Sequence, residues 1–509
     1  MTYYPKEVSR QISWTRRPVQ ALLEDSAKRH PEAVATSFFG ATLTYQELDR
    51  EANRFAHALA GLGVLPGDMV AIHLPNSPQL VICLYGALKA EAIATMICPL
   101  YEKRELSFQL NNSGARVMVT LSQQSILSKA MAAQREGQLQ HLLVTNIKDY
   151  FPPALRALFS VFKEKKGGHR AEILAANGQF WLKDLLKGQP KERPAWTGDT
   201  SDTAVLQYTG GTTGLPKAAE LSHDNLVANA AQVRAWLYEL KEAEERMLLV
   251  LPLFHVYALT CCNLIMHLAG SAILVPQFDL SEILKTINRE KPTVFPGIPA
   301  MYAAINHSLE RGGKKGKADL SSIRICFSGA DRLPDEVQAD FERLSGGRVV
   351  EGYGLTEASP VTHVNPLHGP PKTGSIGLPV TNTEVRIKDF TTGRDAKPGS
   401  EGEMLVRGPQ VMKGYWNEPD ETADVITTDG WLHTGDIARI DEDGYYYIVD
   451  RKKDIIISGG INIYPREIEE VLSQFHKIKE VAVKGLPNKL RGEVVKAYIV
   501  LKENEQATA

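Results

Sequence analysis

Residues 206–223 (LQYTGGTTGLPKAAELSH) gather groups that suit the binding of a polyanion. Glycines permit positive φ and let backbone N–H groups approach a ligand closely, while threonine hydroxyls and one ammonium add donors. These residues are Thr209, Gly210, Gly211, Thr212, Thr213, Gly214 and Lys217. Such a loop suits a triphosphate. It is not a Walker A loop, because Leu-Pro separates the last glycine from the lysine, and a flexible surface turn is the alternative.

Two later segments carry further binding chemistry. Residues 351–360 (EGYGLTEASP) contain an aromatic ring, a hydroxyl and a carboxylate, and residues 429–436 (DGWLHTGD) end in an aspartate. An aromatic ring offers a face to a nucleobase, a hydroxyl donates to phosphate, and a carboxylate oxygen is a ligand that Mg²⁺ prefers. Taken alone, residues 351–360 also fit a Gly-Tyr-Gly turn followed by a capping Thr-Glu pair.

Together, these three segments resemble the signature motifs of the adenylate-forming superfamily, which includes acyl-CoA synthetases, firefly luciferases and the adenylation domains of peptide synthetases. The likeness covers nearly the whole chain and is strongest to bacterial long-chain fatty acid–CoA ligases. It implies that Tyr353 stacks on adenine and that Thr356 hydrogen-bonds the α-phosphate. It also implies that Glu357 and Thr209 hold Mg²⁺, and that Asp436 accepts hydrogen bonds from the ribose hydroxyls.

The same likeness implies roles for further residues. The catalytic set is Lys217, His255, Thr356 and Glu357. The set that binds ATP or AMP is Thr209, Gly210, Gly211, Thr212, Thr213, Gly214, Lys217, Gly329, Ala330, Glu351, Gly352, Tyr353, Gly354, Thr356, Asp436 and Arg451. The expected hinge is Lys453, and the expected loop on the CoA side is Ser458, Gly459 and Gly460. Paired glycines let a backbone pass close to a narrow pantetheine arm.

Residues 251–260 (LPLFHVYALT) resemble the segment that lines the acyl pocket in this superfamily, with its histidine near the substrate carboxylate. By itself, His255 is more typical of a core histidine with satisfied ring nitrogens. The segment contains no acidic residue, although a buried ammonium would need one as a partner. We therefore expect an acid without an α-amine. Asp279, in a similar sequence further on, is expected to cap a helix.

The elements that must position these groups alternate between strands and helices. An apolar helical stripe lies within 18–30, and Thr44 with Glu47 forms a capping-box pattern that opens a helix ending near Gly61 or Gly63. Further expected strands are 69–74, 92–96, 116–121 and 203–208, with a helix at 78–90. Residues 323–330 (IRICFSGA) are a strand running into a small-residue turn, against which a ring or an acyl chain can lie.

This alternation predicts an α/β fold with parallel sheets that helices cover on both faces. We expect a large N-terminal AMP-binding lobe at 1–436, built from several subdomains with parallel βα sheets and a β-rich subdomain around 383–407. A hinge region at 437–453 follows, and then a small α+β C-terminal lobe at 454–509, whose helix begins at Pro465.

The C-terminal lobe is expected to be incomplete. Members of the superfamily carry a lysine in a late Gly-Lys segment, and no such segment follows Leu501. Removing one preorganised donor to developing charge costs roughly 2.7–4 kcal/mol, or about 10²–10³ in rate. Either the chain is shortened or its first half-reaction is crippled.

Residues 150–170 interrupt the alternation of strands and helices. Leu155, Leu158, Phe159 and Phe162 fall at helical spacing, with basic residues displaced from that stripe. An apolar face with basic flanks suits a membrane surface or the entrance for a lipid substrate, and we predict peripheral membrane contact there. The pattern alone favours the alternative, a helix packed on its own domain.

Composition limits the class of protein. A chain of 509 residues predicts two or three packed units, and the net charge of −2 gives no electrostatic case for nucleic acid. The five cysteines show no metal-binding spacing and are expected to be small buried apolar residues. Neither a signal peptide nor a long apolar span is recognised, so we expect a soluble, cytoplasmic protein. A homodimer is a separate expectation.

The predicted function is the ATP-dependent activation of a fatty acid to an acyl-adenylate, followed by transfer to CoA, with ATP, Mg²⁺ and CoA as the small molecules required. No Ser/His/Asp constellation indicates a side-chain nucleophile. The alternatives are a ligase for medium-chain or aryl acids, a nucleotide and acyl binder with crippled adenylation, and an oxygenase of luciferase type.

Overall fold

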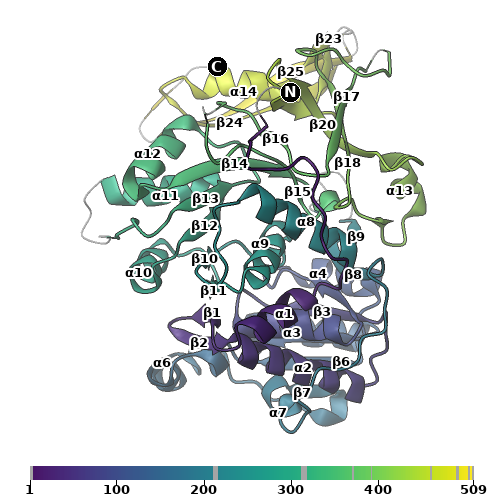
Figure 1. Ribbon diagram of the computed structural model, residues 1–509, viewed down its shortest axis with the longest axis vertical. Helices are drawn as coiled ribbons and strands as arrows, with labels where there is room; N and C mark the ends of the chain where they lie inside the picture. Colours follow the sequence, from purple (N-terminus) through teal and green to yellow (C-terminus); the bar gives the residue numbers. More distant parts are fainter. Residues whose placement is uncertain are drawn as a thin grey trace.

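The computed structural model describes residues 4–209, 216–310, 318–369, 372–390, 392–458, 461–488, 492–502 and 505–506. Two large mixed sheets and the helices around them form the body, and two smaller sheets follow late in the chain. In Figure 1 the late, yellow part of the chain lies at the top, and the purple N-terminal segment runs from there down to the early helices and strands at the bottom. The expected α/β class with a small C-terminal lobe is confirmed.

The first large sheet contains the strand that leads into the predicted phosphate loop. Its strands, in spatial order, are β19 (Gly414–Tyr415), β9 (Ala218–Ser222), β8 (Thr203–Tyr208), β4 (Ile93–Met96), β3 (Met69–His73), β5 (Val117–Leu121), β6 (His141–Thr145) and β7 (Gln179–Trp181). From β8 to β7 all neighbours are parallel, as the sequence predicts. The pairs β8–β9 and β9–β19 are antiparallel, so the sheet is mixed.

The second large sheet carries the strands that lead into residues 329–330 and 355–360. Its strands, in spatial order, are β16 (Leu378–Pro379), β15 (Val361–Val364), β14 (Arg348–Gly354), β13 (Ile325–Ser328), β12 (Val294–Gly297), β10 (Arg246–Leu249), β11 (Ser271–Leu274), β1 (Val34–Phe38) and β2 (Ala41–Thr44). The six strands from β14 to β1 are parallel, and the remaining pairs are antiparallel.

Helices pack on both large sheets and between them. They are α1 (Ala21–Arg29), α2 (Tyr45–Gly61), α3 (Pro78–Lys89), α4 (Lys103–Ser113), α5 (Gln124–Glu136), α6 (Pro153–Leu158), α7 (Leu182–Leu186), α8 (His223–Trp236), α9 (Val256–His267), α10 (Leu280–Glu290), α11 (Pro299–Glu310) and α12 (Asp335–Ser345). Every residue of α3 is buried, and α9 is buried along nearly its whole length. One hydrophobic cluster joins these two helices to both sheets, so they form the shared core.

Local signals predicted several helix starts correctly. The Thr44 hydroxyl accepts a hydrogen bond from the Glu47 backbone N–H, and the Glu47 carboxylate accepts one from the Thr44 backbone N–H. Asp279 caps α10 by accepting a hydrogen bond from the Glu282 N–H at 2.8 Å. Asp279 is therefore a structural cap, as expected, and not a partner for a substrate amine.

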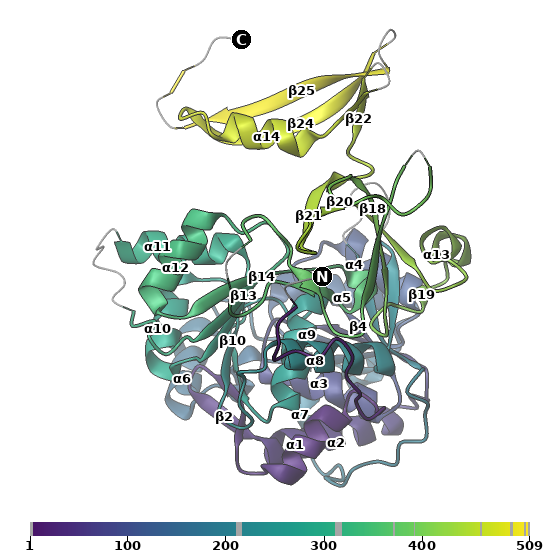
Figure 2. The ribbon, with the colours of Figure 1, turned by 45° about the horizontal axis from the view of Figure 1, so that its top comes forward.

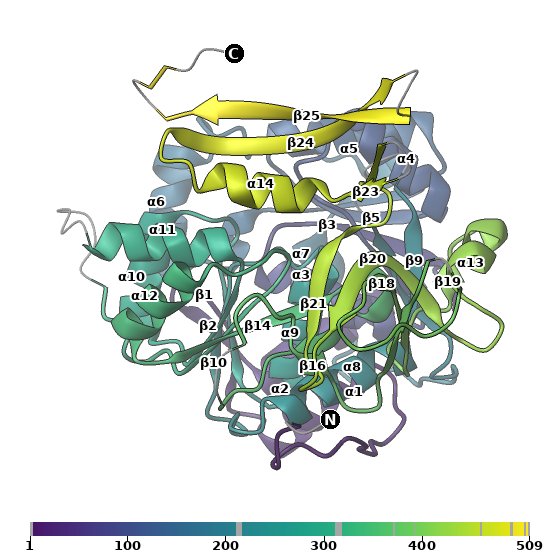
Figure 3. The same cartoon turned by 90° about the horizontal axis from the view of Figure 1, so that it is seen from above.

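The β-rich subdomain and the C-terminal lobe follow in sequence. An antiparallel sheet contains β17 (Glu384–Lys388), β18 (Gly402–Arg407), β20 (Leu432–Ile440) and β21 (Tyr446–Arg451), with α13 (Pro419–Val425) ahead of β20. The last sheet contains β22 (Ile456–Ser458), β23 (Ile461–Ile463), β24 (Ile478–Asn488) and β25 (Gly492–Leu501), and α14 (Pro465–Ser473) packs beside it. Figures 2 and 3 show this yellow lobe on one side of the body. Lys453 lies in the turn between β21 and β22, where the chain passes into the lobe.

Within residues 150–170, a helix runs through 153–163 and changes from α to π geometry. The helix α6 ends at Leu158, and Phe159–Lys163 continue as a π-helical turn. Phe159 packs against Phe151, with ring centroids 5.5 Å apart. Leu158 and Phe162, however, are 55% and 63% exposed, so only part of the predicted apolar stripe contacts the body.

The burial of the cysteines and the length of the apolar helices bear on two expectations from the sequence. Four cysteines are buried and Cys98 is half-buried, in agreement with their interpretation as small apolar residues. Within the described ranges, no helix is both long enough and apolar enough to cross a membrane.

Candidate active site

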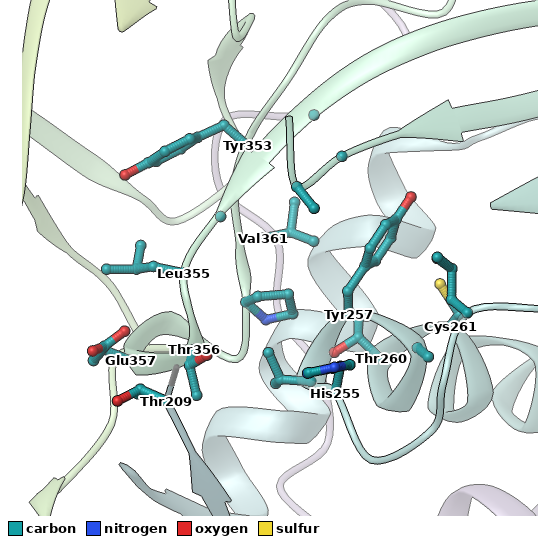
Figure 4. A pocket seen from close by; sticks show the side chains of 18 of the residues that line it. Thr209, His255, Tyr257, Thr260, Cys261, Tyr353, Leu355, Thr356, Glu357 and Val361 are labelled. Atoms are coloured by element: carbon teal, nitrogen blue, oxygen red, sulfur yellow. The ribbon is translucent and has the colours of Figure 1, made fainter. Parts of the chain in front are cut away.

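A cavity of about 1110 Å³ lies where the chain leaves β8, β13 and β14. The segments that follow these strands, together with α9, form most of its walls, and Tyr415 of β19 and Arg451 of β21 reach it from later in the chain. Figure 4 shows Thr209, Thr356, Glu357 and Tyr353 on one side, with Tyr257 and Cys261 on the other. In α/β folds, ligands bind at the carboxyl ends of strands, and this cavity has that location.

The cavity brings together most of the described residues that the sequence predicts for the site. Those that line it are Thr209, Lys217, His255, Gly329, Ala330, Gly352, Tyr353, Gly354, Thr356, Glu357, Arg451 and Lys453. Three predicted residues do not line it, namely Glu351, Asp436 and Ser458. The predicted residues Gly210, Gly211, Thr212, Thr213, Gly214, Gly459 and Gly460 lie outside the described part of the chain.

The two ends of the predicted phosphate loop are held together. Strands β8 and β9 are antiparallel neighbours, and the Thr209 N–H donates to the Lys217 carbonyl at 2.8 Å. This bond closes the loop between its first threonine and its lysine. Both residues therefore face the same cavity, although seven residues separate them in the printed sequence.

Lys217 and Glu357 both contact Tyr415, a residue that the sequence analysis did not predict for the site. The Lys217 ammonium lies 5.2 Å from the centre of the Tyr415 ring, and the Tyr415 hydroxyl donates to Glu357 Oε1 at 2.7 Å. Lys217 also forms an ion pair with Glu421 of α13. Neither Tyr415 nor Glu421 belongs to a segment singled out above, because an isolated tyrosine and an acidic helix start carry no distinctive spacing.

Asp436 connects to the cavity through its neighbours. The Tyr353 hydroxyl donates to the Asp436 carboxylate, and Arg451 Nε lies 3.3 Å from Asp436 Oδ1. The register of β20 and β21 places Asp436 directly opposite Arg451, which explains their contact. Asp436 is only 5% exposed, and burial raises the pKa of its carboxyl group. The pair of donors stabilises the charged form against that cost.

Two glycines let backbone approach backbone beside the cavity. A Cβ on Gly354 would lie 2.3 Å from the Pro360 carbonyl oxygen, which is too close for any side chain. A Cβ on Gly329 would lie 3.3 Å from the Tyr257 ring. These glycines therefore allow β14 to pack against the Pro360 segment and the turn after β13 to pack against Tyr257.

The other half of the cavity is apolar. Its walls include Val233, Trp236, Leu251, Val256, Cys261, Leu264, Met301, Val361 and Val364. Tyr257 is anchored by its hydroxyl, which donates to the Phe327 carbonyl at 2.7 Å. Among the residues that line the cavity, the acidic ones are Glu357, Glu418 and Glu421, and none lies on α9. The apolar wall suits a hydrocarbon chain, and α9 offers no acidic side chain to pair with a substrate amine.

His255 stands at the start of α9 as its N-cap residue. His255 lines the cavity, and the centroid of its ring lies 4.8 Å from that of Phe254. Desolvation by the surrounding protein lowers the pKa of His255, which favours the neutral imidazole. A neutral imidazole next to the apolar walls can donate one hydrogen bond to a carboxylate without adding charge.

Glu351 lies outside the cavity, and its carboxyl pKa is far from the ordinary value. Burial raises its carboxyl pKa to about 7, while Arg332 and Arg466 act in the opposite direction. Arg466 belongs to α14 of the C-terminal lobe, so this carboxyl group faces charge from both the body and the lobe.

Comparison with known proteins identifies the family. The model of the AMP-binding enzyme family matches residues 23–416, which is most of the chain. This chain belongs to the AMP-binding enzyme family. A long-chain-fatty-acid–CoA ligase of Bacillus subtilis (strain 168) is 44% identical over 99% of this chain and 89% of its own length. A feruloyl-CoA synthase of Amycolatopsis sp. is 36% identical over 93% of this chain and 87% of its own length.

A solved structure of the AMP-binding enzyme family gives the same arrangement. The crystal structure of ATP-bound MatB from Rhodopseudomonas palustris superimposes with a TM-score of 0.81 at 26% identity, covering 97% of this chain and 90% of that one. The model of the family's C-terminal domain matches residues 467–509. Together with the coverage of the relatives, this match does not support the expectation of an incomplete C-terminal lobe.

Proposed function

We propose that this member of the AMP-binding enzyme family is an AMP-forming long-chain fatty acid–CoA ligase. The observation that carries the proposal is one cavity with Lys217 and Glu357 at one end and apolar walls at the other. A 44% identical relative, which bears the name long-chain-fatty-acid–CoA ligase, supports the acyl class. Further bacterial proteins of that name are 34–37% identical.

The reaction runs in two displacements, the first at the α-phosphorus of ATP and the second at the acyl carbon. A substrate carboxylate oxygen attacks the α-phosphorus of ATP, and the bond to pyrophosphate breaks. The CoA sulfur then attacks the acyl carbon, AMP leaves, and the thiol proton passes to solvent. No side-chain nucleophile is needed, so the protein acts by positioning the reactants and stabilising charge.

The polar end of the cavity fits Mg²⁺-ATP. Lys217 supplies a cation for the phosphates, Thr209 and Thr356 supply hydroxyls, and Glu357 keeps an oxygen that Tyr415 does not engage. Within the described ranges no cluster of three or more metal-binding side chains occurs, which suits a metal held by one carboxylate, phosphate oxygens and water. Mg²⁺, when bound, offsets the charge that develops on the leaving pyrophosphate.

The nucleoside contacts follow from the geometry around Tyr353. Its ring lines the cavity, and its hydroxyl holds Asp436, which Arg451 flanks. We assign the ring to adenine, and Asp436 with Arg451 to the ribose. Gly329, Ala330, Gly352 and Gly354 line the cavity near that ring, where we place the base.

The acid occupies the apolar end. His255 lies between the polar wall and α9, where a neutral imidazole can hold the carboxylate near the α-phosphate. We propose that the lobe at 454–509 rotates about Lys453 between the two displacements and brings Ser458 and the residues after it to the CoA side. The position of Lys453 in the turn between β21 and β22 supports that assignment.

We also propose that residues 150–170 touch an anionic membrane surface. Leu158, Val161 and Phe162 are 55%, 72% and 63% exposed on one helical stretch, and Lys163, Lys165 and Lys166 follow closely. Apolar side chains next to basic ones suit the boundary between lipid headgroups and acyl chains. The homodimer stays a prediction.

Pyrophosphate exchange and a panel of acids test the function. Exchange that depends on palmitate, with CoA-dependent AMP release, is expected. Preference for octanoate or ferulate over palmitate would replace the long-chain assignment by one of the alternative acids. Binding of ATP without any exchange would instead support the binder with crippled adenylation.

A further inference from the structure

Tyr415 stands between two charged groups of the cavity. Its ring contacts the Lys217 ammonium from one side, and its hydroxyl donates to Glu357 Oε1 at 2.7 Å. Strand pairing fixes its place, because Tyr415 lies opposite Ala219, two residues after Lys217. The Tyr415 N–H also donates to the Thr422 hydroxyl of α13 at 2.8 Å. The ring therefore belongs to a rigid corner made by β9, β19 and α13.

Glu421 provides the counter-ion of Lys217. The two side chains form an ion pair and are 45% and 37% exposed, and both line the cavity. An ion pair this open to solvent contributes little free energy, so another anion can replace the carboxylate at small cost. A triphosphate carries several negative charges on a compact group and is the stronger partner for an ammonium.

We infer that Tyr415 is a positioning residue that orients Glu357 toward the metal and supports Lys217, and that Glu421 holds the Lys217 ammonium until a triphosphate replaces it. This inference rests on the proposed function, because it assigns the ligand of Lys217. Tyr415 occupies one oxygen of Glu357 and leaves the other for a cation. A hydrogen-bonded ligand keeps its orientation and loses less freedom when the metal binds.

The role of Glu421 is tested by calorimetric titration of ATP and Mg²⁺ without any acid, so that no turnover occurs. Glu421→Gln should lower the Kd of ATP by roughly two- to five-fold, since the ammonium no longer has to leave a carboxylate. Glu418→Gln is the matched control, because Glu418 lines the same cavity and the change in charge is equal. Equal shifts in both variants, or no shift in Glu421→Gln, would overturn the exchange.

The role of Tyr415 is tested by Tyr415→Phe, which keeps the ring and removes the hydroxyl. With Mg²⁺ present, the Kd of ATP should rise by about ten-fold, and in EDTA it should match the unmodified protein. Tyr447→Phe is the control, because the Tyr447 hydroxyl donates to Asp441 at 3.1 Å and lines no part of the cavity. A loss of equal size with and without Mg²⁺ would contradict the positioning role.

The two levels of inference fail in different ways. If the unmodified protein binds ATP, and the Kd of ATP in each variant matches that in its control variant, only the roles of Tyr415 and Glu421 are refuted. If the unmodified protein binds no ATP, the proposed function is refuted, and these roles with it. Thermal unfolding of each variant shows whether Tyr415→Phe still folds, and Glu421→Gln gives an independent result if it does not.

Discussion

The Tyr353 hydroxyl donates a hydrogen bond to the Asp436 carboxylate across 83 residues of sequence. One residue lies on β14 of a large sheet and the other on β20 of the β-rich subdomain. Their contact joins two parts of the body beside the cavity, and Arg451 of β21 adds an ion pair to the same carboxylate. The proposed nucleoside end of the site therefore lies where these sheets meet.

Asp436→Asn should weaken ATP binding. The amide keeps the size of the side chain but removes the charge that Tyr353 and Arg451 stabilise. Loss of a hydrogen bond to a charged group costs about 1.5–3 kcal/mol, or roughly 10- to 150-fold in Kd. Calorimetry with ATP measures the change, and Asp395→Asn on the surface serves as the control. An unchanged Kd would remove Asp436 from the nucleotide site.

Lys217→Ala should reduce pyrophosphate exchange by about 10²–10³, the usual loss when one preorganised donor to developing charge is removed. Lys413→Ala is a close control, because Lys413 directly precedes β19, beside β9, but its ammonium donates to the Thr203 hydroxyl and does not line the cavity. Exchange at the unmodified rate in Lys217→Ala would contradict the assignment of the phosphate loop.

Glu351→Gln should make folding stability less dependent on pH. Burial raises the pKa of Glu351 from its ordinary 4.5 to about 7, so the folded state binds a proton more tightly than the unfolded state. Stability from this group is complete below about pH 4.5 and is lost as the pH rises through about 7, by an amount on the order of 1–3 kcal/mol.

Urea unfolding at several pH values between those limits measures this effect. The glutamine variant should lose less stability than the unmodified protein as the pH rises over that interval. Parallel curves for the two proteins would show that the Glu351 carboxyl group does not titrate there.

Cys261→Phe should shorten the acids that the enzyme accepts. Cys261 is 2% exposed on α9 and lines the apolar half of the cavity, so a larger side chain takes up space there. Each methylene that stays out of the cavity costs about 0.8 kcal/mol, or roughly four-fold in kcat/KM. The ratio of kcat/KM for palmitate and octanoate measures the shift, and Cys261→Ala should leave the ratio unchanged. An unaltered ratio in Cys261→Phe would place the acyl chain elsewhere.

Phe162→Ser should weaken binding to vesicles that contain anionic lipid. A phenylalanine side chain that leaves water for the lipid boundary contributes about 1.5–3 kcal/mol, so a loss on the order of ten-fold in partitioning is expected. Co-sedimentation measures it, and Leu65→Ser is the control, because Leu65 is 62% exposed far from α6 in sequence. Equal partitioning of both variants would contradict the proposed membrane contact of residues 150–170.

Some features could be predicted because their interactions are local. The hydrogen bonds between Thr44 and Glu47, and between Asp279 and Glu282, span three residues, so the sequence pattern contains all of their partners. The alternation of apolar strands and helices, which is also a local pattern, predicted a parallel sheet and the strands that form β3, β4, β5 and β8 of the first large sheet. The antiparallel pairing of β19 with β9 at one end of the first sheet was not predicted, because these two strands are far apart in the sequence and only the fold places them side by side.

In residues 150–170 the sequence pattern could not predict which apolar side chains are buried. Helical spacing predicted an apolar stripe, but the spacing is the same whether a side chain meets the body or water. Phe159 packs on Phe151, while Phe162 is exposed, and only the position of the neighbouring segments makes that difference.

The sequence by itself determined the family and the residue types of the nucleotide motifs, because glycines, hydroxyls and carboxylates at those spacings carry their chemistry with them. It also determined that the segment at 251–260 offers an amine no counter-ion. Only the tertiary structure decided that Lys217 meets Glu421, that Tyr415 holds Glu357, and that Tyr353 reaches Asp436. These contacts join residues from 58 to 204 positions apart, and a hydrogen bond or an ion pair forms only between groups that the folded chain brings within a few ångströms.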